Sequence, residues 1–112
     1  MSPKISIIIA TYNAGKTLAR CLQSIREEKT NEIELLVIDG GSKDNTLDII
    51  NTYQDTIDYN CSEPDKGIYD AWNKGITHAK GDWMMFIGAD DYLMNGGLST
   101  YLSLLSQEDY TS

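Results

Sequence analysis

The sequence of 112 residues has no long hydrophobic run and little positive charge. A membrane-spanning helix needs about 20 consecutive apolar residues, and no run approaches that length, so we expect no transmembrane segment. The N-terminus leads directly into strand-like isoleucines without a cleavage site, which argues against a signal peptide. Only 9 Lys and Arg stand against 17 Asp and Glu, and the net charge is −8. This acidity argues against nucleic acid or an anionic membrane surface as a direct partner.

Cysteine is scarce, and repeats and low-complexity tracts are absent. Cys21 and Cys61 lie far apart in dissimilar contexts, so we interpret them as reduced thiols of a cytoplasmic protein, with Cys21 on the apolar face of a helix. Hydrophobic residues make up 41% of the chain, which is typical of a globular protein. We therefore expect residues 1–112 to form one domain.

Three uninterrupted apolar runs predict buried strands at residues 4–10, 33–39 and 83–87. The run Trp83–Ile87 predicts a central strand that is buried on both faces, and a shorter strand is expected around 57–61. Amphipathic helices are expected between the strands, the second capped by Ser42 or Asp44 and the third running from Gly67 to near Gly81. This order predicts an α/β fold, a doubly wound and mostly parallel sheet with helices on both faces.

Polar side chains follow the predicted strands at their carboxyl ends. Thr11 and Asn13 follow the first strand, Asp39 ends the second, and Asp90 and Asp91 follow the last. The carboxyl ends of parallel strands share the edge of the sheet where such folds bind ligands. The simpler alternatives are a helix-capping or turn role for Asp39 and an Asp-rich turn at residues 90–91.

Asp90 and Asp91 place two negative charges side by side, which repel by about 1 kcal/mol in water. A hard divalent cation such as Mg²⁺ or Mn²⁺ relieves this repulsion and leaves coordination positions open for phosphate. We therefore expect a metal site at this position.

A second polar segment lies before the third predicted helix. Asp65, Lys66 and Gly67 stand where the first N–H groups and the positive end of that helix point into the loop. Further along the helix, Asp70 and Lys74 fit an ordinary solvated face.

Residues 10–17 nearly match the phosphate-binding loop pattern GxxxxGK[ST], with Ala10 at the first glycine position and Lys16 at the lysine position. This would predict a P-loop NTPase that binds ATP. Only Gly15 in this loop has the backbone freedom that a phosphate cradle requires, and this interpretation leaves Asp90 and Asp91 without a role.

Four segments together resemble the family 2 glycosyltransferases, inverting enzymes with a Rossmann-like, nucleotide-sugar-binding GT-A fold. The resemblance covers nearly the whole chain in the order of the family. The four segments are Ser6–Asn13, Leu36–Thr46, Glu63–Gly75 and Gly88–Asp91.

The resemblance implies a donor nucleotide site, with a UDP-sugar as the expected donor. Thr11 and Asn13 would line the nucleotide pocket, and Asp39 would accept a hydrogen bond from uracil or another base. Asp65 would approach the base and ribose from the loop that also holds Lys66 and Gly67.

The resemblance also implies that Asp90 and Asp91 bind Mn²⁺ or Mg²⁺, which bridges the diphosphate and offsets the charge on the leaving nucleoside diphosphate. The chain departs from the family pattern at Gly88, where the metal motif often begins with Asp. A second departure is Gly40, where many relatives have another Asp. We expect both to weaken the match without removing the site.

The second half of family members supplies the acceptor site and the carboxylate that acts as general base. We therefore expect residues 1–112 to be the donor domain, truncated after the metal motif, with the acceptor half absent and little or no activity alone. The expected context is surface polysaccharide synthesis with a saccharide or lipid-linked acceptor, at the cytoplasmic face of the cell membrane. The alternative is a non-catalytic nucleotide-binding or assembly module that self-associates through the apolar face left by the missing half.

Overall fold

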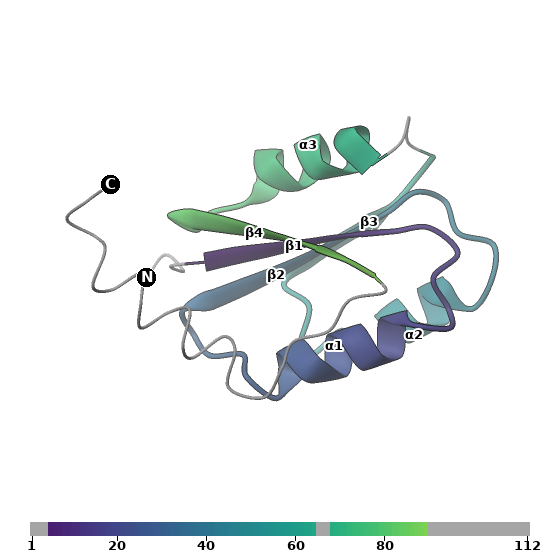
Figure 1. Cartoon of the computed structure of the whole chain (residues 1–112), viewed down its shortest axis with the longest axis horizontal. Helices are drawn as coiled ribbons and strands as arrows, with labels where there is room; N and C mark the ends of the chain where they lie inside the picture. Colours follow the sequence, from purple (N-terminus) through teal and green to yellow (C-terminus); the bar gives the residue numbers. More distant parts are fainter. Residues whose placement is uncertain (1–4, 65–67, 90–112) are drawn as a thin grey trace.

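The computed structural model describes residues 5–64 and 68–89. Within these ranges four parallel strands form one sheet, in the order β3-β2-β1-β4 (Figure 1). The predicted α/β fold with a mostly parallel sheet is therefore confirmed. The strands are β1 (Ile5–Thr11), β2 (Ile33–Asp39), β3 (Tyr59–Ser62) and β4 (Trp83–Gly88).

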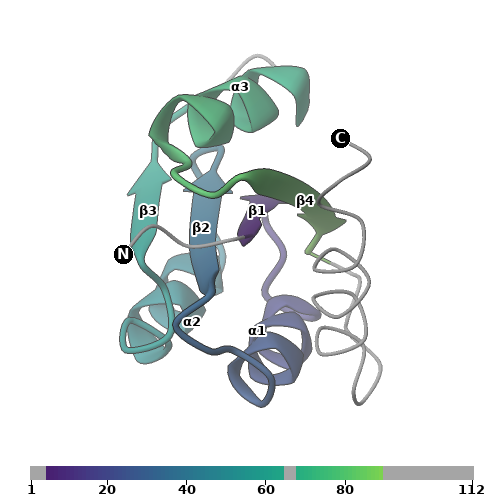
Figure 2. The same ribbon diagram turned by 90° about the vertical axis from the view of Figure 1, so that its left-hand side faces the viewer.

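Three described helices cover both faces of the sheet, as the sequence predicted. Figure 2 shows α1 and α2 below the sheet and α3 above it. The helices are α1 (Leu18–Arg26), α2 (Thr46–Thr52) and α3 (Ile68–His78). None of them combines the length and apolarity that a membrane span requires.

The isoleucine run of β1 is buried because both sides of this strand meet a hydrophobic layer. Ile7 points toward α1 and packs in a cluster with Leu22. Ile8 points to the opposite face, where it joins Leu36 and Ala71 of α3. Successive side chains of a strand alternate between faces, so a central strand with two helical layers must be apolar at every position.

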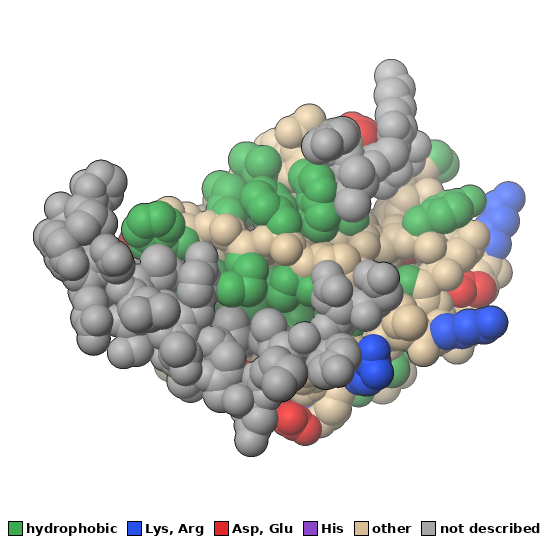
Figure 3. All heavy atoms as spheres, in the orientation of Figure 1, with side chains coloured by type: hydrophobic (Ala, Val, Ile, Leu, Met, Phe, Trp, Pro, Cys, Tyr) green, Lys and Arg blue, Asp and Glu red, His purple; other side chains and the backbone are tan. Residues whose placement is uncertain are grey.

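Among the described residues, Trp83–Ile87 is not the central strand buried on both faces that the sequence predicted. Among the described strands β4 lies at an edge, beside β1 alone. Ile87 is buried on the side of α1, but Met84 and Phe86 on the side of α3 remain 38% and 46% exposed. Figure 3 shows hydrophobic side chains gathered along α3 and β4. An uninterrupted apolar run shows that a strand is hydrophobic on both sides, but it does not show what covers each side.

A buried polar group anchors the connection between α3 and β4. Glu34 accepts hydrogen bonds from the Ser6 hydroxyl at 2.7 Å and from the Lys80 N–H at 2.9 Å. Ser6 in turn accepts the Gly81 N–H at 2.8 Å. The Lys80 N–H thus donates to a side chain of β2, and α3 ends at His78, three residues before Gly81.

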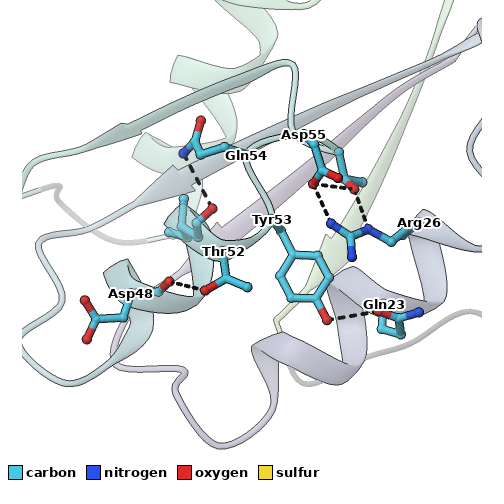
Figure 4. A network of polar contacts seen from close by, with 9 residues as sticks. Gln23, Arg26, Asp48, Thr52, Tyr53, Gln54 and Asp55 are labelled. Atoms are coloured by element: carbon cyan, nitrogen blue, oxygen red, sulfur yellow. Dashed lines mark hydrogen bonds and ion pairs between the residues drawn. The ribbon is translucent and has the colours of Figure 1, made fainter.

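On the other face, α1 is fastened to the segment between α2 and β3 (Figure 4). The Arg26 guanidinium lies 4.5 Å from the centre of the Tyr53 ring, pairs with Asp55 and donates through Nε to Thr56 at 2.9 Å. The Tyr53 hydroxyl donates to Gln23 at 3.1 Å.

Beyond this fastened segment, Ile57 does not enter the sheet. Its N–H still bonds back to the Tyr53 carbonyl. The third strand therefore begins at Tyr59, two residues later than predicted.

Candidate functional site

The carboxyl ends of three neighbouring strands meet at one edge of the sheet. Thr11 at the end of β1 pairs in register with Asp39 at the end of β2, and Asp39 pairs with Ser62 at the end of β3. On the other side of β1, Ala10 pairs with Gly88 of β4. This is the edge at which the sequence predicted a ligand site.

The Asp39 carboxylate connects these strand ends. Its Oδ1 accepts hydrogen bonds from the hydroxyls of Thr11 at 2.5 Å and Ser42 at 2.6 Å. Its Oδ2 accepts from the Gly41 N–H at 3.0 Å, the Ser42 N–H at 2.8 Å and the Ser62 hydroxyl at 2.7 Å. We call these five residues the Asp39 cluster. Its central carboxylate has no accessible surface.

Burial alone raises the pKa of Asp39, because removal from water disfavours the charged form. The hydrogen bonds from Ser42, Thr11 and Ser62 stabilise the carboxylate more strongly, and the net effect lowers its pKa below the ordinary value of 3.8. Asp39 is therefore ionised at neutral pH, with all its acceptor positions used within the chain.

Asn13 joins the loop after β1 to the loop after β2. Its N–H donates to the Ser42 hydroxyl at 2.7 Å, and its Oδ1 accepts the Lys43 N–H at 2.9 Å. Its φ of 50° lies in the left-handed region, which Asn tolerates better than most residues. The predicted pocket residues Thr11 and Asn13 thus lie beside Asp39, and both are tied to its loop.

The next two residues of the first loop are also bonded to the second loop. The Ala14 N–H donates to the Thr46 hydroxyl at 2.7 Å, and the Gly15 N–H donates to Asp44 at 3.0 Å. Asp44 also accepts the Thr46 N–H at 2.9 Å, the first N–H of α2. The N-cap position itself is held by Asn45, without a side-chain cap hydrogen bond, so neither Ser42 nor Asp44 is the N-cap residue that the sequence predicted. The Thr46 hydroxyl bond, followed by the bonds from backbone N–H groups, lowers the pKa of Asp44.

These contacts contradict the phosphate-loop interpretation of residues 10–17. A phosphate cradle needs several backbone N–H groups aimed at the ligand. Here the N–H groups of Asn13, Ala14 and Gly15 donate to side chains of the second loop and of the first residue of α2. The resemblance to a P-loop is therefore one of sequence alone.

The loop after β3 lies against the loop after β2. The Glu63 N–H donates to the Asp39 carbonyl at 3.0 Å, and a Cβ on Gly41, whose φ is +90°, would stand 3.4 Å from the Pro64 nitrogen. Lys74 of α3 pairs with Glu63 at 3.1 Å and with Asp70 at 3.6 Å. Lys74 is therefore not only a solvent-exposed residue of the helix, because its ion pair with Glu63 also connects α3 to the beginning of this loop.

Several predicted site residues lie outside the described residues, namely Asp65, Lys66, Gly67, Asp90 and Asp91. Within residues 5–64 and 68–89, no group of three His, Cys, Asp or Glu side chains is placed to hold a metal ion. The predicted metal site thus stays a prediction. Ala89, which precedes Asp90, follows β4 at the same edge as the Asp39 cluster.

Sequence reasoning missed Ser62, and it assigned Ser42 only a possible capping role. Ser42 followed a Gly-Gly pair, which is an ordinary turn signal, and Ser62 lay directly after the expected strand at 57–61 with no distinguishing pattern. Tyr12 was expected in the same polar loop but was given no role, and its side chain is 64% exposed between Thr11 and Asn13. An exposed aromatic residue in a polar loop after a buried strand was the available signal.

Comparison with known proteins identifies the family of the chain. The model of the family "Glycosyl transferase family 2" matches residues 6–112. A PGL/p-HBAD biosynthesis glycosyltransferase of Mycobacterium tuberculosis is 42% identical over 95 residues, covering 82% of this chain and 37% of the relative. An uncharacterised glycosyltransferase of Mycoplasma pneumoniae is 35% identical, covering 96% of this chain and 38% of the relative. The chain thus spans little more than a third of the length of these relatives.

A solved structure shares the fold over nearly the whole chain. The crystal structure of S. aureus TarS 1-349 in complex with UDP-GlcNAc matches with a TM-score of 0.85 and 25% identity, covering 95% of this chain and 32% of that one. Because the family model covers almost all residues and the fold agrees, the chain belongs to glycosyl transferase family 2.

Proposed function

We propose that residues 1–112 form the donor-binding domain of an inverting, metal-assisted glycosyltransferase. The donor is a nucleotide-sugar, with UDP as the nucleotide, and the acceptor is a saccharide or lipid-linked hydroxyl in surface polysaccharide synthesis. The observation that carries the proposal is the Asp39 cluster, which fixes three strand-end loops at the ligand-binding edge of a parallel sheet. The UDP-GlcNAc complex of TarS supports the choice of nucleotide.

In this proposal the first two loops hold the nucleotide. Thr11 and Asn13 border the pocket, Asp39 accepts a hydrogen bond from the base, and Asp65, Lys66 and Gly67 approach from the loop after β3. Tyr12, exposed at the same edge, offers a flat surface on which a base can stack. Because these loops are already hydrogen-bonded to one another, ligand binding costs little conformational entropy in ordering them.

We further propose that Asp90 and Asp91 hold Mn²⁺ or Mg²⁺. Two carboxylates supply the hard oxygen ligands that these ions prefer. When bound, the ion would supply electrostatic stabilisation of the leaving nucleoside diphosphate. A Mn²⁺ complex with GDP-Man among the structures that share the fold, a mannosyltransferase of Pyrobaculum calidifontis, is compatible with this choice.

The test is a thermal-shift titration with UDP and with ATP, each in Mn²⁺ and in EDTA. At a hundredfold excess over Kd, a ligand that binds only the folded state stabilises it by about 2.7 kcal/mol. We expect stabilisation by UDP with Mn²⁺, a smaller shift in EDTA, and none with ATP. The Asp90→Ala variant should lose the difference between Mn²⁺ and EDTA, and a variant that retains it would refute the metal assignment.

A second candidate is a non-catalytic module of the same fold that self-associates. The observation in its favour is the partly exposed apolar surface formed by Ile76, Met84 and Phe86. Light scattering at rising protein concentration separates the two candidates when combined with the titration. A concentration-dependent dimer without UDP binding would favour the module, and a monomer that binds UDP would favour the donor domain. For either role we propose a cytoplasmic location, peripheral at the inner face of the membrane.

A further inference from the structure

The Asp39 carboxylate is not accessible to a ligand in the present arrangement of side chains. It has no accessible surface, and it already accepts five hydrogen bonds from this chain. An ionised carboxylate offers about four lone-pair positions and has no proton to donate. A ligand N–H can therefore bind Asp39 only if one of the present donors gives way.

The five donors differ in how easily they can leave. Two are backbone N–H groups of the Gly41–Ser42 turn, which is fixed by the chain itself. The hydroxyls of Thr11 and Ser42 belong to residues that are only 4% and 8% exposed, so without Asp39 they would be left in a nearly dry environment. The Ser42 hydroxyl is held further by the N–H of Asn13.

Ser62 is the exception among the donors. It is an exposed residue at the end of β3, an edge strand among those described. Its hydroxyl is bonded to Oδ2 at 2.7 Å but can rotate about its side-chain bond and donate to water instead. Of the five donors, this one can be replaced without opening the two bonded loops.

We propose that Ser62 is a specificity-determining residue of the donor site. Without ligand its hydroxyl donates to Asp39, and on binding an N–H of the base replaces this hydroxyl. The inference rests on the proposed function, in which Asp39 contacts the base. Because a carboxylate only accepts, the exchange requires a base with an N–H, such as the N3–H of uracil, which is the one N–H of that base.

If this exchange occurs, Ser62→Ala should lower the stability of the unliganded protein but raise its affinity for UDP. Without ligand, the variant lacks one hydrogen bond to Asp39 and should melt at a lower temperature. With ligand, the base no longer has to displace an internal donor. A hydrogen bond contributes about 0.5–1.5 kcal/mol net, which corresponds to about two- to tenfold tighter UDP binding. A purely structural Ser62 would instead lower both stability and affinity.

The experiment is a calorimetric titration of UDP, in Mn²⁺, into the wild-type chain and the Ser62→Ala variant. It is repeated with 3-methyluridine diphosphate, in which a methyl group replaces the N3 hydrogen. We expect Ser62→Ala to bind UDP about two- to tenfold more tightly and to gain nothing with the methylated nucleotide. Ser62→Thr keeps a hydroxyl and should retain the wild-type affinity.

The matched control is Ser24→Ala on α1, which removes a hydroxyl that is bonded to the Cys21 carbonyl at 2.7 Å and not to Asp39. It should leave UDP affinity unchanged. If the wild type binds UDP but Ser62→Ala binds it equally or more weakly, or gains equally with the methylated nucleotide, the role of Ser62 is refuted and the donor site stands. If the wild type binds no UDP, the proposed function fails and this inference fails with it.

Discussion

Replacing Asp39 with Asn should destabilise the fold much more than a change of one oxygen to one nitrogen suggests. Hydrogen bonds to charged groups contribute about 1.5–3 kcal/mol each, against about 0.5–1.5 kcal/mol for neutral ones. The substitution removes the charge from five such bonds and turns one acceptor into a donor that faces hydroxyl groups. Because bonds within one network are not additive, we expect a loss of about 2–4 kcal/mol in the free energy of unfolding.

Urea unfolding at pH 7 measures this loss, with Asp82→Asn as the matched control. Asp82 is an exposed residue before β4, where the same chemical change should alter stability by less than about 0.5 kcal/mol. A loss in Asp39→Asn that is no larger than in the control would refute the role assigned to the Asp39 cluster.

The wild type and Asp39→Asn together also test the direction of the pKa shift of Asp39. The folded state lowers the pKa of Asp39 below its unfolded value, so the stabilisation is complete above about pH 4 and is lost as the pH falls through the folded pKa. The difference in stability between wild type and Asp39→Asn should therefore narrow in acid. A difference that stays constant from pH 7 to pH 3 would contradict the argument.

Two further predictions concern the close contact at Gly81 and the lysine of the first loop. A Cβ on Gly81 would stand 2.7 Å from the Ser6 nitrogen, a backbone atom, so Gly81→Ala should destabilise by about 1–3 kcal/mol in urea unfolding. A Cβ on Gly15 would overlap the Asn45 side chain and stand 2.9 Å from the Asp44 side chain. Side chains can shift more easily than backbone, so Gly15→Ala should cost less than Gly81→Ala; equal losses would show that the backbone contact with β1 is not decisive. Lys16→Ala should leave UDP binding unchanged in the thermal-shift assay, because the loop around it is bonded to the second loop and forms no phosphate cradle; loss of nucleotide binding would restore the phosphate-loop interpretation.

The sequence by itself determined the elements and the edge of the sheet that matters. The apolar runs of β1 and β2 and the stripe through Leu18 and Ile25 are local patterns, and each follows from which side of a strand or helix must avoid water. A right-handed parallel arrangement then brings the ends of β1 and β2 together without further information. For this reason the sequence alone predicts that Thr11 and Asp39 lie at one edge, and their pairing in register confirms it.

The tertiary structure alone decided which partners these residues take. Asp39 meets Thr11 and Ser62 across 28 and 23 positions of sequence, and no local pattern encodes the geometry of such hydrogen bonds. The same holds for the N–H groups of Ala14 and Gly15, whose bonds to the second loop exclude a phosphate cradle that the sequence pattern had suggested. The burial of β4 was likewise decided by the tertiary structure. The sequence shows that this strand is hydrophobic, but the burial of each face depends on which other segment packs against it.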